Sequence, residues 1–149
     1  MSPVSMNEIK VYSLGVRFGA YEKNARNSLL GALEILKKKG VCVEVYFVNG
    51  ARMRLVNWRF RGKDKSADVL SFKEPAGFPH PESKLKHLGE IYLSPRYVRK
   101  EVRLAKLSIT KLLIHGLLHL LGYNHKKRND RIRMEKKERQ LLKFLMTNS

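Results

Sequence analysis

The sequence predicts an α+β fold, in which a small mixed β-sheet packs with about five helices. Short segments rich in β-branched and aromatic residues are interspersed with longer segments whose apolar residues recur at helical spacing. The two kinds of segment do not alternate strictly, as they would in a doubly wound α/β protein. With 149 residues, of which 43% are hydrophobic and 30% charged, the chain is expected to fold as a single domain over residues 1–149.

Four segments are predicted to be strands: residues 8–12, 41–48, 68–72 and 88–94. Residues 41–48 are the clearest of these, because nearly all of them are β-branched, aromatic or otherwise apolar. The segment 73–87 is expected to be an irregular loop, since it contains the turn-forming residues Pro75, Gly77, Pro79 and Pro81.

Five segments are predicted to be helical. Residues 24–39 carry an apolar stripe that ends before Gly40, and a short helix over residues 53–58 follows a turn at Asn49-Gly50, with Trp58 expected in the core. Pro95 suits the first turn of a helix that runs to Lys106. Ser108 is expected to cap the next helix, which is the buried central one. The last helix is predicted over residues 130–145, burying Ile132, Met134, Leu141, Leu142 and Leu145.

The charge is strongly and unevenly basic. The chain has 31 Lys and Arg residues against 13 Asp and Glu residues, a formal net charge of +18. Residues 1–50 carry a net charge of +3, residues 51–100 of +7 and residues 101–149 of +8. Charge of this size favours a polyanionic partner, and nucleic acid is preferred over a membrane surface because no basic amphipathic helix with a bulky aromatic face stands out. A solvated basic surface without a partner is the alternative.

The compartment predicted from the sequence is the cytoplasm. Cys42 is the one cysteine, so it has no internal disulfide partner, and its apolar neighbours predict a buried thiol. Residues 1–10 lack the pattern of a signal peptide, and the leucine-rich run around His115 is too short and too polar to cross a membrane.

The most informative stretch is residues 115–125, which hold three of the five histidines. His115 and His119 lie four residues apart and share one face of a helix. Gly122 is the residue expected where a helix ends in a left-handed turn, and such a turn can bring His125 back towards the other two. Three imidazoles with a water in the fourth position form the open site of a catalytic zinc. A single histidine, or an i,i+4 pair, on a leucine-rich helix would more often be a hydrogen-bonded core residue, but three favour a metal site at the end of the central helix.

The same spacing occurs in metzincin metalloproteases, where a glutamate general base follows the first histidine. Here that position is Gly116, and residues 102–129 contain no carboxylate. A metal site is therefore predicted, whereas peptide hydrolysis by that route is not.

The histidine stretch resembles the motif of the YbeY family of bacterial endoribonucleases and rRNA maturation factors. Residues 57–64 (NWRFRGKD), residues 68–72 (DVLSF) and residues 88–91 (LGEI) are similar to further blocks of that family, in the same order, and Met134 and Glu138 fit its last helix. The resemblance covers roughly residue 45 to the end. It implies a single-domain zinc protein, with one zinc ion per chain, that cleaves single-stranded RNA and acts on the 3′ end of 16S rRNA and in ribosome quality control.

Carried over residue by residue, the resemblance implies that the metal ligands are His115, His119 and His125, and that the arginine beside the metal, with a catalytic role, is Arg59. The family usually has an aspartate before the third histidine, where this chain has Asn124. An amide can hold an imidazole by hydrogen bonding but cannot make it more basic through charge.

Other residues could assist. The predicted nucleic-acid-binding residues are Arg59, Arg61, Lys63 and Lys65, because guanidinium groups grip phosphates and the neighbouring Phe60 could stack on an unpaired base. Asp68 is expected either to support a ligating histidine or to cap a strand end. The sequence leaves open two rival functions, a metalloprotease-like zinc hydrolase and a noncatalytic ribosome-binding module stabilised by zinc. It also leaves open whether a general base or the RNA 2′-hydroxyl starts the reaction, and the oligomeric state.

Overall fold

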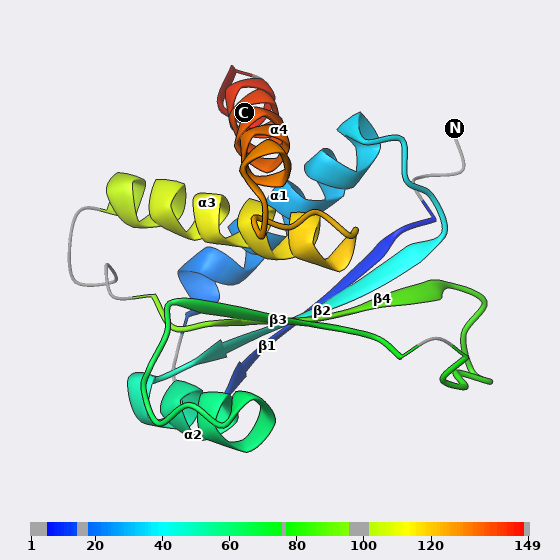
Figure 1. Ribbon diagram of the computed structural model, residues 1–149. Coiled ribbons are helices and arrows are strands. Elements are labelled where there is room, and N and C mark those ends of the chain that lie inside the picture. The colour runs from blue at the N-terminus through cyan, green and yellow to red at the C-terminus, as the bar shows by residue number, and fades with distance from the viewer. Residues whose placement is uncertain (1–5, 15–17, 76, 96–101, 148–149) are drawn as a thin grey trace.

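The computed structural model describes residues 6–14, 18–75, 77–95 and 102–147. These residues form the predicted α+β structure. Helices α1, α3 and α4 lie on one side of the sheet and α2 lies on the other (Figure 1). The strands of the described chain are β1 (Glu8–Leu14), β2 (Val41–Val48), β3 (Val69–Lys73) and β4 (Lys86–Leu93). Its helices are α1 (Gly19–Ile35), α2 (Gly50–Arg61), α3 (Val102–Leu120) and α4 (Arg128–Thr147).

The sheet is mixed, with the strand order β1-β2-β4-β3. Strand β2 pairs in parallel with both β1 and β4, whereas β3 pairs antiparallel with β4 and lies at an edge of the sheet. Helix α1 makes the crossover between β1 and β2, as parallel neighbours require. The edge position of β3 matters for the site described below, because its backbone borders a groove.

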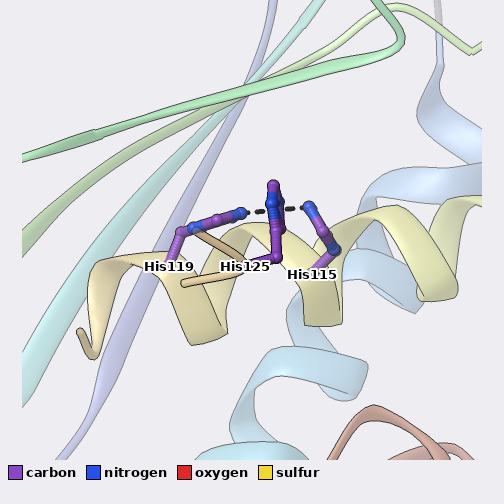
Figure 2. A group of neighbouring side chains, drawn as sticks. All are labelled: His115, His119 and His125. Atoms are coloured by element: carbon purple, nitrogen blue, oxygen red, sulfur yellow. Dashed lines mark hydrogen bonds between the residues drawn. The ribbon is translucent and has the colours of Figure 1, made fainter. Parts of the chain in front are cut away.

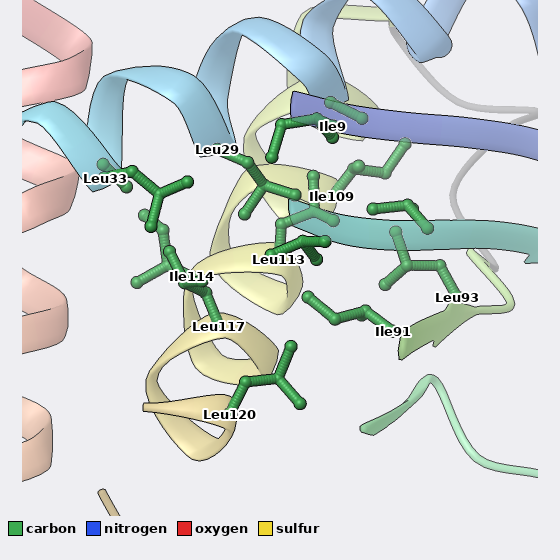
Figure 3. Close-up of a cluster of buried hydrophobic side chains, with 14 of the residues drawn as sticks. Ile9, Leu29, Leu33, Ile91, Leu93, Ile109, Leu113, Ile114, Leu117 and Leu120 are labelled. Carbon is green, nitrogen blue, oxygen red and sulfur yellow. The ribbon is translucent and has the colours of Figure 1, made fainter. Parts of the chain in front are cut away.

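The core lies between the sheet and the layer formed by α1 and α3 (Figure 3). Alternate residues of β2 and β4, among them Phe47, Ile91 and Leu93, point to this side and are fully buried. Helix α3 meets them with an almost continuous apolar face, which comprises Ile109, Leu113, Ile114, Leu117 and Leu118. Met134 and Leu141 of α4 complete this core, so α3 is covered by the sheet on one side and by α4 on another.

Gly89 allows β4 to pass close to both β3 and α3. The pairing of β2 with β4 shifts here, since Cys42 pairs with His87 while Val43 pairs with Gly89. Gly89 has a φ of +143°, which side-chain-bearing residues rarely adopt. A Cβ atom at this position would overlap the carbonyl oxygen of Phe72 and would lie 2.9 Å from Leu120 Cδ2.

The described residues form one helix fewer than predicted, because the helix expected to end at Lys106 and the central helix expected to begin after Ser108 form one continuous helix, α3. Helix α3 runs without a break through Ser108, which therefore does not act as a cap. A serine side chain favours the cap position of a helix, but burial of the apolar face on both sides of Ser108 outweighs that local preference. The start that was predicted at Pro95 falls mainly on residues 96–101, which lie outside the described residues.

The bounds of α1 and α2 also differ from the predicted ones, for local reasons. Helix α1 begins at Gly19 and ends at Ile35, four residues before the predicted end, because Lys37 adopts a left-handed conformation (φ 57°). Asn49 is the N-cap of α2 and not part of a turn, since its side chain accepts a hydrogen bond from the Arg52 backbone N–H at 2.8 Å. Helix α2 is thus longer than predicted and ends at Arg61, with Gly62 (φ 68°) as its C-cap.

Two apolar residues expected in the core lie at the surface. Trp58 is 58% exposed and Ile132 is 50% exposed. Met53 of α2 packs against the sheet and Asn57 is buried on the same side of the helix, which places Trp58 on the outer side. Cys42 is buried as predicted, and burial is the main reason that its thiol pKa rises to about 11. In the described part of the chain, no helix combines the length and the apolar character needed to cross a lipid bilayer.

Replacing Gly89 with alanine is expected to destabilise the protein by at least about 2 kcal/mol, because the substitution adds steric overlap to an unfavourable φ. Gly40→Ala is the matched control, since Gly40 also has a positive φ (+69°) but its Cβ would meet no atom within 4 Å. That variant should lose about 1 kcal/mol. Chemical denaturation of both variants measures the difference, and equal losses would show that the close approach at Gly89 contributes nothing.

Candidate metal centre

The three histidines come together at the C-terminal end of α3 (Figure 2). His115 and His119 are one turn apart on α3, and His125 follows in the loop before α4. Helix α3 ends in a left-handed turn at Gly122 (φ +99°), where the Tyr123 backbone N–H donates to the Leu118 carbonyl at 2.9 Å. This turn reverses the chain and returns His125 to the other two side chains, as the sequence predicted.

The geometry of the three rings suits a metal ion. One candidate ligand atom from each histidine lies within 4.8 Å of the other two, and the Nε2 atoms of His115 and His119 are 3.1 Å apart. Two imidazole nitrogens bound tetrahedrally to zinc at 2.0–2.1 Å would be separated by about 3.3 Å. In the described chain no cysteine or carboxylate joins this group, so a bound ion would keep an open coordination position.

The electrostatic environment keeps the His119 ring neutral, which is the form that binds metal. Burial is the largest cause of the lowered pKa of His119, and the neighbouring His115 and His125 lower it further. A backbone hydrogen bond at Tyr123 opposes this effect, while the positive charge of Arg61 adds to it.

Glu138 on α4 orients the His115 ring. The Nδ1 atom of His115 lies 3.1 Å from Glu138 Oε1, so the ring donates to the carboxylate and directs Nε2 towards the other histidines. The sequence resemblance includes Glu138 but implies no role for it. A signal was present, because Glu138 lies on the face of α4 that carries the buried Met134 and Leu141, where a carboxylate needs a partner.

Asn124 and Asp68, the two residues expected to support the histidines, make different contacts. The Asn124 side-chain oxygen accepts from the Lys126 backbone N–H at 3.1 Å, so it stabilises the loop that carries His125. Asp68 precedes β3, and its carbonyl oxygen accepts from the Ser94 backbone N–H at 2.9 Å. A role for Asp68 in supporting a histidine remains a prediction.

A groove of about 350 Å³ runs beside the histidines, between α3 and the edge strand β3. Arg61 and Lys73 bring two positive charges to its walls, together with Ser71. The Arg61 side chain is fixed there, because Nη2 donates to the Ser71 carbonyl at 2.9 Å and the guanidinium lies 5.1 Å from the centre of the Phe72 ring. Lys73 was missed in the sequence because it stands alone between a strand and a loop.

Arg59, which the resemblance implied beside the metal, is not among the residues lining the described groove. Residues 59 and 61 are about 200° apart around a helix, so only one of the two can face β3. The arginine that shares the groove with the histidines is Arg61. The catalytic role predicted for Arg59 therefore lacks the geometric support that Arg61 has.

The other predicted RNA-binding residues, Lys63 and Lys65, are exposed in the segment that follows α2. The acidic residue between them does not neutralise them, since Asp64 is engaged by Arg54 at 2.6 Å. The backbone of this segment is held by the Asn57 side chain, which donates to the Lys65 carbonyl at 2.8 Å. The positive charges of Lys63 and Lys65 thus remain available to an anion.

A side chain at position 116, where a metalloprotease of this type has its glutamate, would be crowded by Ile91. A Cβ atom on Gly116 would lie 3.0 Å from Ile91 Cγ2 and 3.3 Å from Ile91 Cδ1. Helix α3 packs directly on β4 at this point. The glycine at position 116 is therefore explained by the close packing of the helix on the sheet. The groove beside the histidines has no carboxylate in its described lining.

The chain is similar to proteins of one family, endoribonuclease YbeY. The family model of endoribonuclease YbeY matches residues 12–146. The chain is 38% identical over 107 residues to the endoribonuclease YbeY of Chelativorans sp. (strain BNC1), covering 69% of this chain, and 34% identical over 110 residues to that of Persephonella marina, covering 71% of each. A solution structure of a protein from Thermotoga maritima aligns with a TM-score of 0.55 and 26% identity, over 94% of this chain and 93% of that one.

None of these curated relatives is matched over its full length. The chain matches 65% of the Chelativorans protein and 62% of the Anaeromyxobacter protein.

We expect the purified protein to bind one transition-metal ion and to lose it in His115→Ala, His119→Ala and His125→Ala. His80→Ala is the control, because His80 lies in the loop before β4, where it pairs with Glu74. Since the ion binds the folded state, a chelator should lower the melting temperature of the wild type and of the control but not of the three variants. Metal analysis that finds one ion per chain in all four variants would place the site elsewhere.

Glu138→Gln is expected to weaken metal binding about 10- to 100-fold, because the amide cannot supply the negative charge that makes His115 a better ligand. Glu34→Gln makes the same change in charge at an exposed position of α1, and Glu34 lines neither of the two pockets that the histidines border, so affinity should stay within about threefold. Competition with a chromogenic chelator measures both affinities. Equal affinities in the two variants would show that Glu138 does not act on the metal site.

Proposed function

Because this chain belongs to the YbeY endoribonuclease family, we propose that it is a metal-dependent endoribonuclease that cleaves single-stranded RNA. The observation that carries this proposal is the groove in which Arg61 and Lys73 lie beside the three histidines. Such a groove combines a site for a Lewis acid with cationic side chains, which is the combination needed to hold a phosphodiester and to stabilise its transition state.

The proposed metal ion is zinc, since three imidazoles with an open fourth position are typical of catalytic zinc sites. His115, His119 and His125 would hold the ion, and Glu138 would fix the orientation of His115. When bound, the ion would supply a positive charge that polarises a phosphoryl oxygen. The sequence resemblance implied the same metal and the same three ligands.

Arg61 is the proposed catalytic arginine. It lines the groove, and its contacts with Ser71 and Phe72 use only part of its five N–H donors. The remaining donors can approach the phosphate in a fixed direction, so they can meet negative charge as it develops in the transition state. Lys73, which also borders the groove, would contribute a second, more mobile charge that binds the substrate.

We further propose that the substrate is precursor ribosomal RNA, at the 3′ end of 16S rRNA, in the bacterial cytoplasm. The family resemblance suggests this substrate, and the net charge of +18 is consistent with a large RNA or a ribosomal particle as partner. A lone buried cysteine is consistent with a reducing compartment. The oligomeric state does not enter this proposal.

The two rival functions have less support. Gly116 stands where a metzincin protease has its glutamate general base, and a Cβ atom at this position would press on Ile91. A zinc ion that only stabilises the fold normally has a fourth protein ligand. Within the described chain the histidine group has three members, which favours the enzyme over the noncatalytic module.

The test is a single-turnover cleavage assay at saturating enzyme, with end-labelled single-stranded RNA and the matching duplex as substrates. We expect the wild type to cleave the single strand faster than the duplex, and His119→Ala to lose cleavage together with its metal. Arg61→Ala should keep its fold and metal and cleave on the order of 100-fold more slowly, the size of the loss when one oxyanion donor is removed.

Arg59→Ala serves as the matched variant, since it removes the same charge from the same turn of α2. It should cleave within about threefold of the wild-type rate at saturation, because a residue used only for docking contributes to ground-state binding. A large loss in Arg59→Ala with a normal rate in Arg61→Ala would restore the role that the resemblance implied. A wild type that retains its metal but cleaves no RNA would refute the proposed function.

A further inference from the structure

An aromatic side chain stands exposed beside the proposed catalytic arginine. Phe60 precedes Arg61 in the last turn of α2 and is 63% exposed. Its ring contacts that of Phe72 on β3, with ring centres 5.5 Å apart and planes tilted by 56°. An apolar ring exposed to water is common on protein surfaces, but this one contacts the Phe72 ring and directly precedes Arg61, which lines the groove beside the histidines.

Phe72 provides that fixed place. Its ring packs edge-on against Tyr92, with centres 5.8 Å apart, and Tyr92 stacks in turn on Tyr46 at 4.9 Å. These rings form a row across the side of the sheet that faces α2. Phe60 therefore packs against the end of a supported row of rings, and most of its own surface stays open to a further ring.

The position of Phe60 relative to the groove follows from the alternation of side chains on β3. Ser71 and Lys73 border the groove, whereas Phe72, between them, points to the opposite side of the strand, towards α2. Arg61 spans the two sides, since it donates to the Ser71 carbonyl and lies over the Phe72 ring. Because β3 is an edge strand (Figure 1), an RNA strand can cross this edge with a phosphate on one side and a base on the other.

We propose that Phe60 forms a stacking subsite for one unpaired RNA base, adjacent to the nucleotide whose phosphate occupies the groove. This inference rests on the proposed function. Exposed aromatic rings next to cationic side chains bind single strands in this way, because every base has a face that can stack once it is unpaired. In a duplex that face is covered by neighbouring bases, so the subsite selects single-stranded substrate.

Trp58 is the other exposed aromatic residue of α2, and its surroundings differ. It lies one turn from Leu55, which is also exposed, on the outer side of the helix. Trp58 therefore provides a control for nonspecific stacking on the same basic helix.

The first test measures the enzyme concentration that gives half the maximal single-turnover rate. Phe60→Leu should raise this concentration about 10-fold for single-stranded RNA, the typical loss when one stacking ring is removed. The maximal rate should stay within about threefold, because Arg61 and the metal are retained. Trp58→Leu should match the wild type in both quantities. An unchanged half-saturation in Phe60→Leu, or an equal loss in Trp58→Leu, would overturn the proposal.

A second test identifies the stacked base. RNA substrates with one abasic nucleotide, placed at successive positions around the cleavage site, should bind the wild type normally at all positions except one. At that position the missing base should cost the wild type about 10-fold and cost Phe60→Leu nothing further, because the ring and the base belong to one interaction. Independent losses at every position would contradict the subsite.

The third readout does not depend on cleavage. Trp58 is the only tryptophan in the chain, so the double variant Trp58→Phe, Phe60→Trp moves the fluorescent ring to position 60. Oligouridine should quench the emission of this variant and leave the emission of wild-type Trp58 nearly unchanged. Quenching without cleavage would support the subsite and refute the nuclease proposal, whereas cleavage without quenching would do the reverse.

Discussion

The contact between α3 and the sheet is the interaction on which the rest of the structure depends. Helix α3 buries an apolar face against β4 and another against α1 and α4. At Gly116 the helix approaches so closely that a Cβ atom would press on Ile91. This contact sets both the position and the rotation of the helix. His115 and His119 consequently face the groove beside β3, since their neighbours on the helix are buried elsewhere.

The site also depends on where the carboxylates lie. The chain has few of them, and several are paired away from the groove. Asp64 is bound by Arg54, and Glu44 and Glu90 accept hydrogen bonds from Tyr46 and Tyr92 on the α2 side of the sheet. Burial is the main cause of the raised pKa of Glu90. The described lining of the groove holds imidazoles and cations, an environment that attracts phosphate.

The two halves of the site differ in how they are held. The histidines stand on a buried helix and on a loop tied by Gly122 and Asn124, and Glu138 approaches from α4. Arg61 comes from the opposite side of the sheet, on the last turn of α2, and reaches over the edge strand. A substrate in the groove would therefore touch both layers of the fold. The edge strand β3 therefore forms part of the proposed binding surface. Because it lies at an edge, its Ser71 carbonyl can accept a hydrogen bond from the Arg61 side chain.

Some features of the protein were determined by the sequence alone, because they depend on local geometry. The i,i+4 spacing of His115 and His119 and the left-handed turn at Gly122 are properties of one short segment, and the predicted triad has the predicted form. Strand β2 was also predicted with its observed bounds, since nearly all of residues 41–48 are apolar, β-branched or aromatic and so favour a buried strand. Family membership followed from the same local motifs, which the family comparison confirmed.

Other features were decided by tertiary structure, because they depend on which face of an element meets another. Ser108 lies inside a continuous helix because packing along α3 outweighs a capping preference. The choice of Arg61 over Arg59 at the groove, and the exposure of Trp58, follow from the rotation of α2 on the sheet. Glu138 reaches His115 across 23 residues of sequence, a distance over which periodicity carries no information. Local spacing specified the group of three histidines, and the packing of helices on the sheet specified its surroundings.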